Sequence, residues 1–392
     1  MNVKNLYKQY VLNTYTRVGP VFVKGKGSWL WDNNGKRYLD LFPGWGVNIL
    51  GHCHPGIAKT ISEQSKILIH VPNNLYHNYQ ALLAREIIRN SFKGKVFFAN
   101  SGAEAIEGAL KLAKVFANLN KKSQIICMSD SFHGRTMGAL SFTAQKKYQG
   151  PFKPLISGVR VAKFGDFQSF KKQVTKKTAA VILEPIQGEA GVNVARKEYF
   201  INLRRFCSKR KILLIFDEVQ TGMGRTGELF CFKNYDIEPD VFTLSKGLGA
   251  GFPISAFIVK DEYSGFLKPG MHASTFGGNP LATRVSLEVF RIIKDDKILQ
   301  NVRKQGTLLK EKLLHFKEKF GIIKEVRGLG LMRALDLKVE AQGIFKQALE
   351  SGLIINSTHN TVLRIMPALT IDSKTLLKGL GILEKILERF NR

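Results

Sequence analysis

Apolar runs that favour strands alternate with helical patterns between about residues 95 and 260 of the chain. Several of these runs are almost continuously hydrophobic, which is typical of strands covered by helices on both faces of a sheet. The pattern therefore predicts an α/β fold with a mostly parallel central sheet. The expected strands are Lys95–Ala99, Gln124–Met128, Ala179–Glu184, Ile212–Phe216, Val241–Leu244 and Ile254–Val259.

The later part of the chain follows a different pattern. Helical periodicity dominates Asn279–Leu314 and returns over Ser373–Phe390. Between them, Gly321–Leu337 and Leu353–Ile365 favour short strands with turns. A length of 392 residues suits two or three domains. We therefore expect a large domain over residues 50–280, and a smaller α+β domain that residues 1–49 and 281–392 build together.

The charge balance is unusually basic, with 60 Lys and Arg against 31 acidic residues and a net charge of +29. Such a surface could bind nucleic acid, or it could concentrate anionic small molecules. The basic residues come in short groups such as Lys121-Lys122 and Lys209-Arg210-Lys211, without interleaved aromatic residues. We therefore expect no nucleic-acid partner, and a basic nucleic-acid-binding protein stays open as the alternative.

Several sequence features bear on compartment and metal content. No apolar run reaches the roughly 18 residues of a membrane span, and Met1–Tyr10 lacks the apolar core of a secretory signal. The four cysteines are scattered, which favours a reduced, cytoplasmic protein without a membrane partner. His52-Cys53-His54 lacks a second ligand pair and adjoins a Pro-Gly turn, so we expect no metal site.

Two segments at predicted strand ends suggest a ligand site. Ser101 and Glu104 have capping-box spacing after the first strand, and Gly102 between them lets the backbone approach a phosphate at the helix start. Asp217 and Glu218 end an apolar strand, where α/β folds bind ligands. Neighbours on a strand point to opposite sides, so these acids form no acid/base pair. Each segment could also be a plain helix or turn cap.

Lys246 has the most telling local context. It follows the strand Val241–Leu244 and precedes glycines at positions 247, 249 and 251. Burial would lower its pKa toward neutrality and make it a nucleophile able to form a Schiff base. The segment Gly222–Gly227 fits a dinucleotide-binding fingerprint, but it neither follows a strand directly nor opens a helical pattern. We therefore expect no dinucleotide site there.

Together, the motifs resemble the class III (subgroup II) PLP-dependent aminotransferases, above all their acetylornithine-type members. The resemblance covers nearly the whole chain from Asn13 onward. It implies the type I fold of PLP-dependent transferases. It rests on Ser101-Gly102-Ala103-Glu104-Ala105, Phe132-His133-Gly134-Arg135-Thr136, Asp217-Glu218-Val219-Gln220-Thr221-Gly222, Ser245-Lys246-Gly247, Glu184–Glu189, Thr275–Pro280, Arg327-Gly328 and Leu363–Pro367.

The resemblance implies pyridoxal 5'-phosphate (PLP) as cofactor and assigns residues to it. Lys246 would hold it as a Schiff base and move a proton between the substrate and the cofactor. Asp217 would pair with the ring nitrogen, Phe132 and His133 would lie on the ring face, and Gln220 near the phenolic oxygen. The remaining cofactor-binding residues would be Ser101, Gly102, Ala103, Val219 and Thr275, with Thr275 given by the neighbouring subunit of a homodimer with shared active sites.

The resemblance also implies the substrates. Arg135 and Arg364 would anchor carboxylates with Ser274 nearby, and Glu189 would mask Arg364 for the amino donor and release it for 2-oxoglutarate. The expected reaction converts N-acetylornithine, or a related ω-amino acid, and 2-oxoglutarate to the semialdehyde and glutamate in arginine biosynthesis. Trp45 stands where acetylornithine enzymes are expected to have a smaller apolar residue. Ornithine, succinylornithine and carrier-bound lysine therefore stay open as donors, and an aminomutase of the same fold stays open as the activity.

Overall fold

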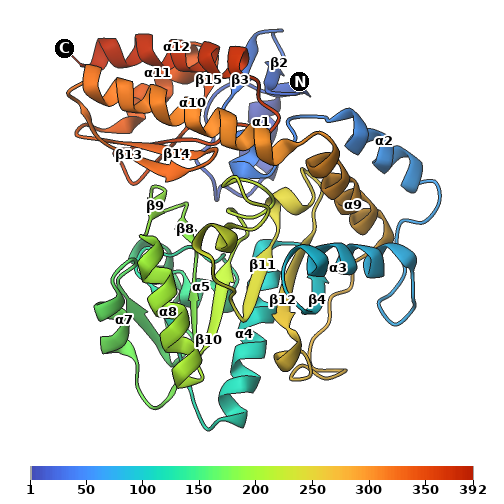
Figure 1. The fold of residues 1–392 in the computed structure, drawn as a ribbon. Coiled ribbons are helices and arrows are strands. Elements are labelled where there is room, and N and C mark those ends of the chain that lie inside the picture. Colours follow the sequence, from blue (N-terminus) through green and yellow to red (C-terminus); the bar gives the residue numbers. More distant parts are fainter. Residues whose placement is uncertain (1, 392) are drawn as a thin grey trace.

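The computed structural model describes residues 2–391, and a seven-stranded sheet lies at its centre (Figure 1). The strand order is β4-β12-β11-β10-β7-β5-β6. Strands β11, β10, β7, β5 and β6 pair in parallel, and β12 runs antiparallel to both of its neighbours. The predicted mostly parallel α/β sheet is confirmed. The strands are β4 (Gly94–Ala99), β5 (Gln124–Met128), β6 (Val159–Ala162), β7 (Thr178–Leu183), β10 (Leu213–Asp217), β11 (Val241–Leu244) and β12 (Ser255–Lys260).

The six strands expected from the sequence agree with the structure to within one residue at each end. The seventh, β6, was not predicted. It lies at the edge of the sheet, and only Ala162 of its four residues is buried. An edge strand that is mostly open to solvent needs no continuous apolar run, so the pattern that reveals the central strands is absent from it.

Helices cover both faces of this sheet, and strand β10 shows how. Leu213 and Ile215 pack in one apolar cluster with helix α4 (Gly102–Leu119). Leu214 and Phe216 pack in another, with helices α7 (Phe167–Gln173) and α8 (Lys197–Arg210). All five residues of β10 are buried. This double coverage explains the unbroken hydrophobic run that ends at Asp217.

Two smaller sheets are built from the end regions of the chain, one from both regions and the other from the C-terminal region alone. One has the order β1-β2-β3-β15 and joins residues near the N-terminus to a strand after residue 350. The other has the order β13-β14-β17-β16. In Figure 1 the blue N-terminal strands lie beside the orange and red C-terminal helices. The strands are β1 (Phe22–Lys26), β2 (Trp29–Asp32), β3 (Arg37–Asp40), β13 (Ile323–Leu329), β14 (Met332–Leu337), β15 (Leu353–Ile354), β16 (Asn356–Thr358) and β17 (Val362–Ile365).

The helical region expected over Asn279–Leu314 consists of two helices, because Lys297 has a left-handed backbone (φ 52°) between them. They are α9 (Pro280–Asp295) and α10 (Ile298–Lys319). The predicted domain boundaries near residues 50 and 280 stay predictions. The other helices are α1 (Val3–Tyr10), α2 (Pro55–Gln64), α3 (Asn78–Asn90), α5 (Met137–Phe142), α6 (Lys146–Gln149), α11 (Ala341–Glu350) and α12 (Ser373–Phe390), and strands β8 (Ile186–Gln187) and β9 (Asn193–Val194) form a hairpin.

Among residues 2–391, no helix combines the length and the apolar character needed to cross a membrane. The same residues contain no group of three or more His, Cys, Asp or Glu side chains arranged to hold a metal ion. The His52-Cys53-His54 segment has structural contacts instead. His52 Nε2 lies 2.8 Å from Asp40 Oδ2, and His54 Nδ1 accepts a hydrogen bond from Gly56 N at the start of α2.

Candidate active site

Three strand ends bring the candidate residues together at one edge of the central sheet. Ser101 follows β4, Asp217 ends β10, and Lys246 follows β11. Strands β4 and β11 are both antiparallel to β12, and β10 is parallel to β11, so all three point their carboxyl ends the same way. This edge is where open α/β sheets bind ligands.

The start of helix α4 has the geometry of a capped helix with free backbone N–H groups. Ser101 is the N-cap, and its Oγ accepts from Glu104 N at 3.3 Å. Glu104 Oε2 accepts from Asn100 N at 2.8 Å, which completes a variant of the predicted capping box. The N–H groups of Gly102 and Ala103 have no hydrogen-bond partner in the described part of the chain. Such free groups at a helix start attract phosphate.

Glycine is required at position 102 because another segment packs against it. A Cβ atom there would lie 2.9 Å from Val219 Cγ1, closer than real Cβ contacts. A Cβ atom at Gly134 would similarly meet Ala103 Cβ at 2.9 Å. The helix start, the segment after Asp217 and the segment after Phe132 are therefore in direct contact, although they are far apart in the sequence.

Asp217 is 5% exposed and receives three hydrogen bonds. Its Oδ1 accepts from Val219 N at 3.0 Å and from Thr243 Oγ1 at 3.2 Å. His133 Nδ1 donates to Oδ2 at 2.7 Å. The resemblance placed His133 on a ring face and did not foresee this contact. The carboxylate is held in one orientation, which an electrostatic partner of a bound ring requires.

Glu218 points away from Asp217, as the alternation of a strand predicts. Its two carboxylate oxygens accept from Cys231 N at 2.6 Å and from Phe232 N at 2.7 Å. Burial raises the pKa of Glu218 to about 8. It fastens the loop that follows β10 and takes no part in an acid/base pair with its neighbour.

Lys246 lies in an environment that favours the neutral amine. Its pKa is lowered to about 8, mainly by burial and also by the positive charge of Arg364, while the Asp217 carboxylate opposes the shift. Its backbone has a positive φ of 37°, a conformation that non-glycine residues rarely adopt and that clusters at functional sites. A lysine with a pKa near neutrality can act as a nucleophile.

Glu184 is a site residue that the sequence reasoning did not single out. Its Oε2 accepts from Phe132 N at 3.0 Å. Burial raises its pKa well above the usual value, and the nearby Asp217 carboxylate adds to the rise. The motif Glu184–Glu189 was visible in the sequence. The contact of Glu184 with Phe132 joins positions 52 residues apart, so no local sequence pattern could predict it.

Arg364 lies on β17 of a small sheet, and its guanidinium forms hydrogen bonds in three directions. Nη2 lies 3.1 Å from Glu189 Oε2, Nη1 donates to Gly188 O at 2.9 Å, and Nε donates to Asn356 Oδ1 at 2.7 Å. The ion pair that the resemblance implied is therefore formed. Glu189 is also fixed through its backbone, because Thr358 Oγ1 donates to Glu189 O at 3.0 Å.

Arg135 is placed by aromatic contacts. Its guanidinium carbon lies 3.5 Å from the centroid of the Tyr148 ring and 5.3 Å from that of Phe132. Tyr148 also contributes to the electrostatic surroundings of Arg364. Tyr148 was missed in the sequence, where it follows two lysines and looks like a surface residue.

Gln220 lies between the loop that carries Trp45 and the segment at Gly188. Its Nε2 donates to Trp45 O at 3.2 Å, and a Cβ atom at Gly188 would collide with its Oε1. Trp45 itself has a left-handed backbone (φ 57°), which is unusual for a bulky residue. The loop that carries Trp45 is thus held at the site.

Ser274 and Thr275 precede helix α9. Ser274 Oγ accepts from Asn100 Nδ2 at 3.3 Å and from Gly277 N at 3.0 Å, so it lies beside the start of α4. Thr275 is exposed, and so is the neighbouring Phe276. The expected contact of Thr275 with a phosphate in a second subunit stays a prediction.

A family model described as "Aminotransferase class-III" matches residues 11–387. The chain belongs to the class-III aminotransferases. The chain is 45% identical over 386 residues to the acetylornithine aminotransferase of Clostridium acetobutylicum, an alignment that covers 97% of this chain and 100% of that protein. The class-III assignment agrees with the family that the sequence motifs indicated.

Solved structures of similar proteins share the fold of this class-III aminotransferase. One is the ornithine aminotransferase of Toxoplasma gondii, with partial PLP occupancy at its active site. It is 31% identical at a TM-score of 0.94 and covers 98% of this chain and 93% of its own. Another is the N-acetylornithine aminotransferase of Stenotrophomonas maltophilia, 33% identical at a TM-score of 0.86, with 98% of each chain covered.

The lowered pKa of Lys246 can be tested through its reactivity in cofactor-free protein. At pH 8 about half of an amine with a pKa of about 8 is neutral, against below about 1% of an ordinary lysine. We expect a small acylating reagent to modify Lys246 faster than the exposed lysines, along a pH profile with its midpoint near 8. Peptide mass spectrometry measures each site. Modification no faster than at the exposed lysines would contradict the electrostatic account.

Proposed function

We propose that the chain transfers the terminal amino group of N-acetylornithine to 2-oxoglutarate, as a step of arginine biosynthesis. The products would be the semialdehyde of the donor and glutamate. Membership of the class-III aminotransferases and the identity to the Clostridium enzyme support this proposal. The observation that carries it is the position of Lys246, whose pKa is about 8, close enough to Asp217, Arg364 and Glu189 for their charges to affect that pKa.

The donor set at the sheet edge fits PLP. The free N–H groups of the α4 start suit its phosphate, the Asp217 carboxylate suits its ring nitrogen, and the Lys246 amine suits its carbonyl carbon. Phe132 would cover the ring, and Gln220 would lie near the phenolic oxygen. When bound, PLP supplies an electron sink for the charge that develops as the substrate carbon loses its proton.

The residues of the chain supply the proton transfers and the orientation. Lys246 would take the proton from the carbon that bears the substrate amine and deliver it to the C4′ carbon of the cofactor, and a pKa of about 8 suits a base that works near neutral pH. Through its hydrogen bond, His133 would hold Asp217 in position. Glu184 would fix the backbone of Phe132, and hence the wall of the pocket.

Two substrates would share one pocket through the Arg364–Glu189 pair. When the amino donor binds, Glu189 would neutralise Arg364, and Arg135 would take the donor carboxylate. When 2-oxoglutarate binds, the Glu189 side chain would leave Arg364 free to form a two-pronged contact with the second carboxylate. The backbone contact of Glu189 with Thr358 supports a movement that is confined to the side chain.

Glu189→Ala should affect the two half-reactions unequally. We expect the half-reaction with the amino donor to slow by about tenfold, because Arg364 is then never masked. The half-reaction with 2-oxoglutarate should keep its rate. Single-turnover absorbance of the enzyme measures each separately. Glu228→Ala is the control, because Glu228 pairs with Arg303 on the surface. Equal slowing of both half-reactions would contradict the switch.

The choice of donor is open to a direct assay. N-acetylornithine, ornithine, succinylornithine and carrier-bound lysine are each supplied with 2-oxoglutarate, and the glutamate formed is measured. We expect N-acetylornithine to give the highest kcat/KM, and Lys246→Ala to form no glutamate from any donor. Preference for another donor would move the assignment to that substrate, and Trp45 would be the first pocket residue to examine.

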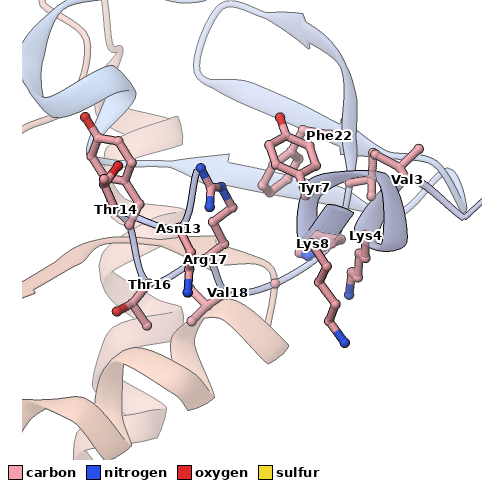
Figure 2. A pocket seen from close by; sticks show the side chains of 14 residues that line it. Val3, Lys4, Tyr7, Lys8, Asn13, Thr14, Thr16, Arg17, Val18 and Phe22 are labelled. Carbon is pink, nitrogen blue, oxygen red and sulfur yellow. The ribbon is translucent and has the colours of Figure 1, made fainter. Parts of the chain in front are cut away.

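We further propose a cytoplasmic homodimer with shared active sites. The four cysteines are free thiols, which suits a reducing compartment. Exposed apolar residues, including Ile67, Tyr76 and Phe276, offer a surface for a second copy. Helix α1 has no buried residue and borders a cavity of about 970 Å³ that residues of the segment Val3–Phe22 line (Figure 2). A second subunit would cover these surfaces and receive Thr275.

Mixing two defective variants tests the shared site. Lys246→Ala subunits lack the essential amine, and Thr275→Ala subunits would lack the phosphate contact that they give to the partner. Each homodimer should be inactive or bind PLP weakly. Refolding them together should restore activity, because half of the sites in the mixed dimer contain both residues. No recovery beyond that of the Thr275→Ala protein alone would contradict sharing of the site.

A further inference from the structure

Arg225 is fully buried and has no acidic partner among residues 2–391. Its Nη1 donates to Leu331 O at 3.1 Å and to Pro367 O at 2.5 Å. Its Nε and Nη2 find no hydrogen-bond acceptor within residues 2–391, and no carboxylate of these residues forms a salt bridge with it. Burial lowers its pKa to about 9. The positive charge of Arg225 is thus held by two carbonyl oxygens alone.

The position of Arg225 links the two halves of the candidate site. The loop that carries Arg225 follows Asp217–Gln220, the segment at the end of strand β10 in the central sheet. The acceptors of Arg225 belong to the small sheet, because Leu331 precedes β14 and Pro367 lies three residues after Arg364. Arg225 thereby joins the loop after Asp217 to the sheet that carries Arg364. This contact can fix the distance between these two residues.

The backbone strengthens the same contact. Leu331 N donates to Arg225 O at 3.1 Å, so residues 225 and 331 are joined in both directions. Gly330 has a φ of 55°, and a Cβ atom there would lie 2.6 Å from the carbonyl carbon of Thr226. Only glycine allows the turn before β14 to come this close to the loop.

A buried guanidinium without a carboxylate partner is expensive, and an apolar side chain of similar length would fill the same space without that cost. A local feature that sacrifices stability is expected mainly where function requires it. We propose that Arg225 is a positioning residue that fixes Arg364 relative to Asp217 and Lys246, and so sets the affinity for a dicarboxylate substrate. This inference rests on the proposed function, in which Arg364 binds the second carboxylate of 2-oxoglutarate.

Arg225→Met tests this role in the holoenzyme. Glutarate is the probe, because it carries both carboxylates of the acceptor and cannot react. We expect its dissociation constant, measured by calorimetry, to rise by about tenfold, the scale of a small misplacement of a binding group. The Michaelis constant for the acceptor 2-oxoglutarate should rise in parallel. The Michaelis constant for the amino donor should change little, because Glu189 masks Arg364 while the donor is bound. The absorbance of bound PLP should stay normal.

Arg333→Met is the matched control. Arg333 is also buried, with a pKa that burial lowers to about 10, but its hydrogen bonds go to Gly328 in β13 and to Gly330 in the turn between β13 and β14. The affinity of this variant for glutarate should equal that of the wild type. If Arg225→Met does not fold, the glutarate dissociation constant of Arg225→Lys decides instead. This variant keeps the positive charge and loses the guanidinium that binds both carbonyl oxygens.

The possible outcomes separate this inference from the proposed function. If the wild type itself fails to bind glutarate, both the dicarboxylate acceptor and the inference are overturned. If the wild type binds it and Arg225→Met binds it equally well, only the positioning role is overturned. A loss of thermal stability with unchanged glutarate affinity would likewise reduce Arg225 to a structural residue. A selective loss of glutarate affinity that Arg333→Met does not share supports the inference.

Discussion

The buried carboxylate of Asp217 is the constraint on which the rest of the site depends. A charge at the end of a fully covered strand is costly unless it is hydrogen-bonded and paired. His133, Val219 and Thr243 supply three donors, and the Lys246 amine contributes a positive charge nearby. Val219 lies two residues after Asp217, but Thr243 belongs to the neighbouring strand β11 and His133 is 84 residues away. The carboxylate therefore receives all three hydrogen bonds only when β10 and β11 are paired and the His133 segment is in place.

The site as a whole combines charges of both signs in little space. Lys246 and Arg364 lie near Asp217, Glu184 and Glu189. Burial is the main cause of the pKa shifts of Lys246 and Glu184, and the neighbouring charges contribute to both shifts. Adding or removing one substrate carboxylate therefore changes the balance appreciably, because screening is weak inside a protein. A pocket of this kind can respond to the charge of what enters it, which is what an enzyme with two successive substrates needs.

The central strands, and the placement of Asp217 and Lys246 at one edge of the sheet, could be predicted from the sequence because both depend on local signals. Continuous apolar runs mark strands covered on two faces, and Lys246 and Asp217 stand directly at their ends. Strand β6 was missed because it lies at an exposed edge. The contact of His133 with Asp217, the role of Glu184 and the buried Arg225 were missed because each arises from packing between distant segments. Their residue types alone suggest nothing unusual.

The central claim is that Asp217 and Lys246 form a PLP site at the carboxyl edge of the sheet. Visible absorbance of the purified protein, before and after addition of PLP, tests it most directly when the wild type is compared with Asp217→Ala. The account predicts a yellow wild-type protein, and an Asp217→Ala variant that loses its colour on dialysis. A colourless wild type whose spectrum does not change when PLP is added would contradict it.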